Sequence, residues 1–171
     1  MEIQNLNQSF EVRLDTCETI TEFADFFKKH NITKCVYTWY RDNPITGKRD
    51  VINIGKTADN EAENYGDYAS RIKRKISAIP GWNRNIPENV RNCKTANEYR
   101  ERISRYMPDL HKDEVTIKID MLNHLNDHEI NNFEAEAIAQ YKRKHGILPD
   151  LNSVQPRVKY NTDKTFNLLF V

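Results

Sequence analysis

The chain has 171 residues, of which 26 are lysine or arginine, 25 are aspartate or glutamate and 38% are hydrophobic. This length and composition predict one compact, soluble domain that spans residues 1–171. The three cysteines are far apart and form no Cys-x-x-Cys pair, which argues against a disulfide framework or a zinc ribbon and favours a reducing, cytoplasmic setting. No run of 18 apolar residues occurs and the N-terminus lacks the pattern of a signal peptide, so we expect neither a membrane span nor secretion.

The first third of the chain is predicted to contain a strand, a helix and a β-hairpin. Residues 9–14 alternate between polar and apolar side chains, as a half-buried strand does. Thr19 and Glu22 have the spacing of a capping box at the start of a helix. Two β-rich runs, residues 34–40 and 50–54, flank a loop that contains proline and glycine, which predicts a hairpin.

The rest of the chain is predicted to alternate between helices and strands. The expected elements are a helix over residues 68–79, a helix over 96–106, a strand over 114–119, a long helix over 128–145 that ends at Gly146, and two short strands within 157–171. This order predicts an α/β or α+β domain, with a small, mainly antiparallel β-sheet flanked by helices.

The net charge of +1 conceals an uneven distribution. Residues 71–105 carry ten basic and three acidic side chains, and the rest of the chain is acidic overall. One interpretation is a solvent-exposed helical face. The other is a surface that binds the phosphate groups of nucleic acid. The candidate DNA-binding residues in this segment are Lys73, Arg74, Lys75, Arg84 and Arg91.

The long C-terminal helix contains a carboxylate where an apolar residue is expected. Its apolar stripe includes Ile130, Phe133 and Ile138, and Glu134 falls within that stripe, whereas Glu136 points away from it. Burying an unpaired carboxylate costs several kcal/mol. Glu134 is therefore expected either to pair with a nearby lysine or arginine, or to belong to a metal-binding or catalytic site.

Arg71 and Tyr37 are two further candidates, and each has an ordinary structural explanation. Arg71 precedes the apolar Ile72 and so lies near the rim of the buried face of its helix, where a surface cation is common. Tyr37 alternates with Val36 on the first hairpin strand and would be a half-buried aromatic residue. Taken singly, neither residue indicates a function.

The order of these residues along the chain resembles the GIY-YIG endonuclease family. The matching residues are Cys35-Val36-Tyr37, Asn53-Ile54-Gly55-Lys56-Thr57, Arg71, Glu134, Ile138, Pro149 and Asn152. They correspond in order to the tyrosine strand, the second strand, the arginine helix and the glutamate helix of the family. The resemblance implies a core over about residues 34–152, with a strand and helix added in 1–33 and a β tail in 153–171.

Two departures from the family pattern stand out. The first motif reads Cys-Val-Tyr in place of Gly-Ile-Tyr, so Tyr37 is retained. The second motif carries Asn53 where the family has its second tyrosine. Asn53 itself, or a loop residue such as Tyr65, would take the place of that tyrosine.

The resemblance implies a divalent-metal-dependent endodeoxyribonuclease, of the standalone restriction or phage type. Glu134 would bind one Mg²⁺ (or Mn²⁺) largely through water molecules, as suits a hard ion that dehydrates reluctantly. Tyr37 would orient or deprotonate the attacking water, directly or through a relay, and Arg71 would clamp the phosphate with its planar guanidinium.

The remaining candidates of the site have supporting roles. Lys56 and Lys75 would contact phosphate, and Asn152 would brace the site without reacting. The partner would be double-stranded DNA. Cleavage of both strands requires two active sites, so the proposed reaction, and not any particular residue, leads us to expect a homodimer. Two alternatives stay open: a catalytically silent nucleic-acid-binding module on the same fold, and an interaction protein whose basic helix binds an acidic partner.

Overall fold

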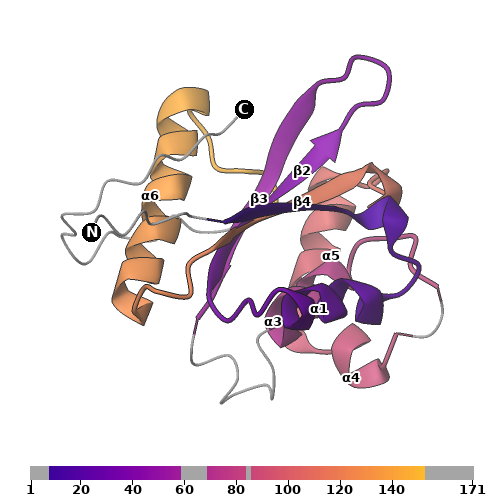
Figure 1. Cartoon of the computed structure of the whole chain (residues 1–171). Helices are drawn as coiled ribbons and strands as arrows, with labels where there is room; N and C mark the ends of the chain where they lie inside the picture. Colours follow the sequence, from indigo (N-terminus) through magenta and orange to yellow (C-terminus); the bar gives the residue numbers. More distant parts are fainter. Residues whose placement is uncertain (1–7, 59–68, 84–85, 153–171) are drawn as a thin grey trace.

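The computed structural model describes residues 8–58, 69–83 and 86–152. Its centre is a four-stranded antiparallel sheet with the strand order β1-β4-β2-β3 (Figure 1). The strands are β1 (Ser9–Arg13), β2 (Cys35–Asp42), β3 (Arg49–Thr57) and β4 (Val115–Met121). The predicted α+β class, with an antiparallel sheet flanked by helices, is confirmed.

The helices lie on both faces of the sheet (Figure 1). They are α1 (Ile20–Lys29), α3 (Ser70–Ile76), α4 (Glu88–Arg91), α5 (Lys94–Tyr106) and α6 (Asp127–His145). Residues of α1, α3 and α5 share one hydrophobic cluster with one face of the sheet, and residues of α6 share a second cluster with the other face. Both faces of β2 are therefore covered, which explains why its first six residues are all buried.

Helix α6 begins and ends where its local chemistry dictates. Asn126 and Glu129 form a reciprocal capping box at its start. Gly146 ends it with a φ of 77°, in the left-handed conformation that glycine adopts without penalty. The predicted range of 128–145 is thus confirmed to within one residue.

Some elements differ from the sequence-based expectation. The expected helix over residues 96–106 starts earlier, because the sulfur of Cys93 accepts a hydrogen bond from the backbone of Ala96 and caps α5. The four-residue helix α4 was not expected, since so short a segment has no measurable periodicity. The expected strands within 157–171 lie outside the described residues, as does Tyr65. No helix in the described ranges is long and apolar enough to cross a membrane.

The register of the hairpin determines which side chains meet at the edge of the sheet. Tyr37 of β2 lies opposite Gly55 of β3, and Trp39 lies opposite Asn53. Alternation along each strand directs these four positions to the face that carries α3 and α5. Because β3 is an edge strand, groups from either face of the sheet can meet beside it.

Candidate active site at the edge of the sheet

Tyr37 is buried in the interior against the backbone of β3. Its side chain has no exposed surface, and its ring lies directly over Gly55: a Cβ atom at position 55 would stand 2.5 Å from three atoms of the phenol. Only glycine leaves room for the ring at that distance. The Gly55 of the second motif is therefore explained by the close approach of the Tyr37 ring.

Lys75 of α3 reaches into the same space. Its Nζ atom donates a hydrogen bond of 2.7 Å to the hydroxyl oxygen of Tyr37, and the residue is buried. Burial raises the pKa of the Tyr37 phenol and Lys75 only partly opposes that effect, so the phenol is neutral at neutral pH. Burial lowers the pKa of the Lys75 ammonium, and the hydrogen bond that the Tyr37 oxygen accepts acts in the other direction.

Tyr99 of α5 was missed by the sequence reasoning and lies on the other side of Lys75. The ammonium of Lys75 is 5.4 Å from the centroid of the Tyr99 ring and 5.3 Å from that of Tyr37, which are cation–π distances. The Tyr99 hydroxyl donates a hydrogen bond of 3.2 Å to Oδ1 of Asn53. The side chain of Asn53 on β3 thus accepts a hydrogen bond from a tyrosine of another element, α5.

Glu134 is half-buried on α6 and approaches the site from the opposite face of the sheet. Burial raises the pKa of its carboxyl group, and the positive charges of Lys56, Lys75 and Arg71 act in the other direction. Within the described part of the chain, its carboxylate makes no direct hydrogen bond or salt bridge. Three positive charges therefore act on this carboxylate although none of them is bonded to it, and carboxyl groups with perturbed pKa values are frequent at functional sites.

Arg71 stands in the first turn of α3 and is half-buried. Its charge acts on both the phenol of Tyr37 and the carboxyl group of Glu134. Six of the predicted residues are thus linked, directly or through Tyr99, by hydrogen bonds or by the effect of one charge on another: Tyr37, Asn53, Lys56, Arg71, Lys75 and Glu134. They come from β2, β3, α3 and α6.

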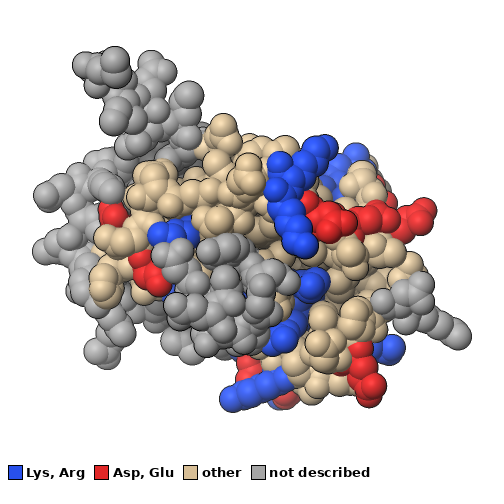
Figure 2. Space-filling model, turned by 60° about the horizontal axis from the view of Figure 1, so that its bottom comes forward, with Lys and Arg blue, Asp and Glu red and all other residues tan. Residues whose placement is uncertain are grey.

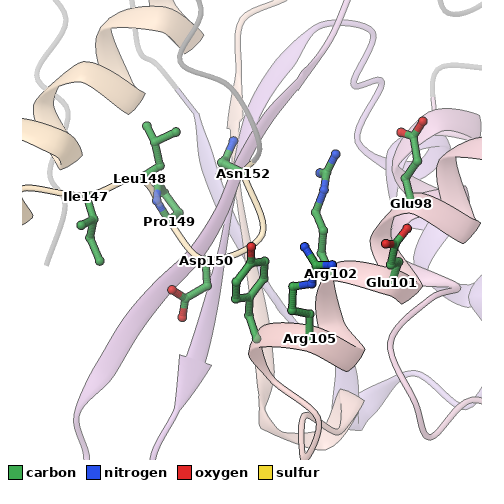
Figure 3. A pocket seen from close by; sticks show the side chains of 10 residues that line it. Glu98, Glu101, Arg102, Arg105, Ile147, Leu148, Pro149, Asp150 and Asn152 are labelled. Carbon is green, nitrogen blue, oxygen red and sulfur yellow. The ribbon is translucent and has the colours of Figure 1, made fainter.

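Asn152 lies beside the same strand (Figure 3). Its side-chain amide accepts a hydrogen bond from the backbone N–H of Ile54 and donates one to the carbonyl of Ile54, both 2.9 Å long. The N–H of Leu151 donates to the carbonyl of Ile52, also at 2.9 Å. The segment therefore pairs with the free edge of β3 next to Gly55 and fixes the strand without reaching the charged groups, as a bracing residue would.

The other basic residues of the 71–105 segment occupy different places. Lys73 and Arg74 are half-buried on α3, and Arg91 is exposed on α4. Arg84 lies outside the described residues. Figure 2 shows lysine and arginine side chains in a band across the side that carries these helices, with acidic side chains beside it. Lys75 differs from this group because its described contacts are with two tyrosines inside the site.

The residues around Glu134 fit a magnesium ion only together with a substrate. Among the described residues, no group of three or more histidine, cysteine, aspartate or glutamate side chains could hold a metal ion. Mg²⁺ is commonly held by one or two carboxylates, by water and by the phosphate oxygens of the substrate. A single carboxylate is compatible with that arrangement, and the neighbouring cations would disfavour a metal ion in the absence of phosphate.

Comparison with protein-family models, with curated proteins and with solved structures found no match to this chain.

Substitutions of Lys75 and Tyr37, which share a hydrogen bond, are expected to have strongly coupled effects on the free energy of unfolding. Tyr37→Phe leaves a buried ammonium without its acceptor, and Lys75→Met removes the donor from a buried hydroxyl. An unsatisfied buried polar group costs about 1–3 kcal/mol, and more when it is charged. We expect the double variant to be more stable than the sum of the single effects indicates, with a coupling of about 1–3 kcal/mol in denaturant unfolding. Combining Tyr37→Phe with Lys73→Met should give additive changes, and additivity in the first pair as well would contradict the contact.

Proposed function

We propose that the protein is a divalent-metal-dependent endonuclease of the GIY-YIG type, which hydrolyses phosphodiester bonds in double-stranded DNA in the cytoplasm. The observation that carries the proposal is that the charge of Arg71 acts on both the phenol of Tyr37 and the carboxyl group of Glu134, although the three side chains come from separate elements on both faces of the sheet. A tyrosine, an arginine and a carboxylate without a direct bonding partner are side chains suited to a water nucleophile, a phosphate and a metal ion.

Tyr37 would orient the attacking water. Its phenol is neutral at neutral pH because burial raises its pKa, so it can hydrogen-bond a water molecule but does not begin as a phenolate base. Lys75 donates to the phenol oxygen and thereby restricts the direction in which the hydroxyl proton points. Lys75 therefore acts through Tyr37, as a positioning residue.

Arg71 and Lys56 would bind the phosphate. The planar guanidinium of Arg71 presents paired N–H donors that match two non-bridging oxygens, and its charge stabilises the additional negative charge of the transition state. Lys56 follows Gly55 on β3 and is half-buried. Its charge acts on the carboxyl group of Glu134, which supports a role for Lys56 at the same phosphate.

Glu134 would hold the divalent ion together with the oxygens of the substrate phosphate. The chemistry that such an ion would supply is stabilisation of the negative charge on the departing 3′ oxygen. The positive charges of Lys56 and Arg71, which act on Glu134, would attract the DNA backbone before the metal ion binds. Asn152 would hold β3, and with it Gly55 and Lys56, in place.

Arg71→Lys is expected to lower the cleavage rate by about 10²-fold or more, since a point charge replaces a two-pronged donor that acts in the transition state. Affinity for DNA should change little, because the positive charge is kept. The measurement is the rate of plasmid cleavage together with the dissociation constant for the same DNA. Arg143→Lys, on the exposed surface of α6, is the matched control and should cleave like the wild type. A fully active Arg71→Lys variant would contradict the proposed role of the Arg71 guanidinium in binding the phosphate.

A second candidate function is a catalytically silent nucleic-acid-binding module on the same fold. It is favoured by Asn53, which stands in place of a tyrosine and is engaged with Tyr99. Cleavage of the bound DNA distinguishes the two functions. A silent module binds DNA with a salt-dependent affinity and leaves it intact in Mg²⁺ or Mn²⁺.

A further inference from the structure

The outer face of α5 carries a stripe of charges with a definite polarity. Glu98, Glu101, Arg102 and Arg105 lie at positions i, i+3, i+4 and i+7 of the helix, and so on one side of it. Glu98, Glu101 and Arg105 are exposed and Arg102 is half-buried. The two acidic residues come first along the helix and the two arginines follow.

These charges are not paired with one another, although their spacing favours it. Glu98 with Arg102, and Glu101 with Arg105, are both i, i+4 pairs with the acid on the N-terminal side, the better orientation for an ion pair within a helix. Arg102 instead donates 2.9 Å to the carbonyl oxygen of Leu151 and lies over the ring of Tyr99. Within the described residues, Glu98, Glu101 and Arg105 form no hydrogen bond or salt bridge.

A hollow of about 630 Å³ lies beside the stripe, between α5 and residues 147–152. Figure 3 shows Arg102 extending into the space between α5 and Asn152, with Glu98 and Glu101 on the far side of it. Tyr106 and Ile147 also line this hollow, and they are 57% and 61% exposed. Among the described residues only one other large hydrophobic side chain, Ile45, is as exposed. The face thus combines unpaired charges of both signs with exposed apolar surface, the composition of a protein–protein interface.

The charges argue against nucleic acid as the occupant of this face. Three carboxylates line the hollow, those of Glu98, Glu101 and Asp150, against the two arginines. A phosphate backbone would be repelled by this excess of negative charge. A surface with acids at one end and arginines at the other complements a copy of itself that runs in the opposite direction.

We propose that two copies of this chain associate through α5, which packs antiparallel against the α5 of the other copy. A twofold axis between residues 101 and 102 places Glu98 opposite the partner's Arg105 and Glu101 opposite the partner's Arg102. Both contacts occur twice, as an isologous interface requires. Tyr106 and Ile147 supply apolar contact at its border. This inference stands on the α5 surface alone and does not depend on the proposed nuclease activity.

Charge reversal on each side of the predicted pair tests the interface. Glu98→Arg places two arginines opposite each other at two points of the dimer, and Arg105→Glu does the same with two glutamates. By sedimentation velocity, we expect the wild type to be a dimer. Each variant alone should have a dimer dissociation constant at least about 10-fold higher than that of the wild type, since like charges in an interface disfavour association. An equimolar mixture of the two variants restores opposite charges at both points and should form dimers with an affinity within a few-fold of the wild type.

Three results would overturn this assignment. They are a wild type that remains monomeric up to the highest soluble concentration, single variants that stay as dimeric as the wild type, and a mixture that stays monomeric. Glu88→Arg, an exposed reversal of the same type on α4, is the matched control and should not change the association. Thermal unfolding of every variant separates loss of the interface from loss of the fold.

Discussion

Replacing Glu134 by glutamine is expected to abolish DNA cleavage while the affinity for DNA changes by no more than a few-fold. Glutamine keeps the shape of the side chain but removes the negative charge that would hold the metal ion. The charges of Lys56 and Arg71, which act on Glu134 in the wild type, are unchanged by the substitution and still attract the phosphate backbone. Cleavage of a plasmid in Mg²⁺ and a binding isotherm for the same DNA in Ca²⁺ or EDTA measure the two quantities separately.

The same variant is expected to be at least as stable as the wild type at neutral pH. Burial raises the pKa of Glu134, so the folded state holds its proton more tightly than the unfolded chain does. The ionised carboxylate therefore destabilises the fold above the pKa of the unfolded chain, and this penalty grows as the pH rises towards the folded-state pKa. We expect Glu134→Gln to gain stability over that window and to equal the wild type at pH values below it.

Glu136 provides the control on the same helix. Its carboxylate forms an exposed salt bridge with Arg143, 2.8 Å long, and such pairs contribute little to stability. Glu136→Gln should therefore cleave DNA like the wild type. Loss of cleavage in the Glu136 variant, with retention in the Glu134 variant, would reverse the assignment of the helix face.

Gly55→Ala is expected to destabilise the fold by about 1–3 kcal/mol or more, the usual range for an overpacked interior. The added methyl group would stand 2.5 Å from the Tyr37 ring, which is fully buried and held by Lys75. The ring must move, and the phenol would move out of its hydrogen bond. For a chain of this length, each kcal/mol corresponds to about 2–4 °C in Tm, so the change is measurable by thermal unfolding, and DNA cleavage should fall with it.

The cost of Gly55→Ala in a Tyr37→Ala variant shows whether contact with the Tyr37 ring causes the loss of stability. Tyr37→Ala removes the ring and opens space beside position 55. In that background the additional Gly55→Ala substitution should cost much less than it does in the wild type, because the methyl group no longer meets the phenol. Equal costs in the two backgrounds would mean that Gly55 is required for another reason, such as the backbone of β3.

The sequence predicted the parts of the fold that depend on local chemistry. The predicted cap Thr19 begins α1, Gly146 ends α6, and the proline- and glycine-containing loop between β2 and β3 delimits the hairpin. These signals act within a few residues and need no tertiary information. The order of the strands in the sheet is different, because it depends on contacts between residues far apart in the chain.

The candidate site was predictable only in part, for the same reason. Glu134 was recognisable as a carboxylate within an apolar stripe. Lys75 appeared as one of several cations on a basic helix, since nothing in a single sequence shows that its ammonium reaches a tyrosine on another element. Tyr99 shares the buried face of α5 with Ala96 and Ile103 and so resembles an ordinary core residue. The one signal available was its hydroxyl, which must find a partner when a tyrosine is buried.

The most direct test of the account is incubation of the purified protein with supercoiled plasmid DNA in Mg²⁺, with EDTA as the metal-free control. The proposed arrangement of Tyr37, Arg71 and Glu134 predicts nicked and then linear DNA in Mg²⁺, no cleavage in EDTA, and no cleavage by Glu134→Gln in either condition. A wild-type protein that binds the plasmid but leaves it supercoiled in both Mg²⁺ and Mn²⁺ would contradict the proposal.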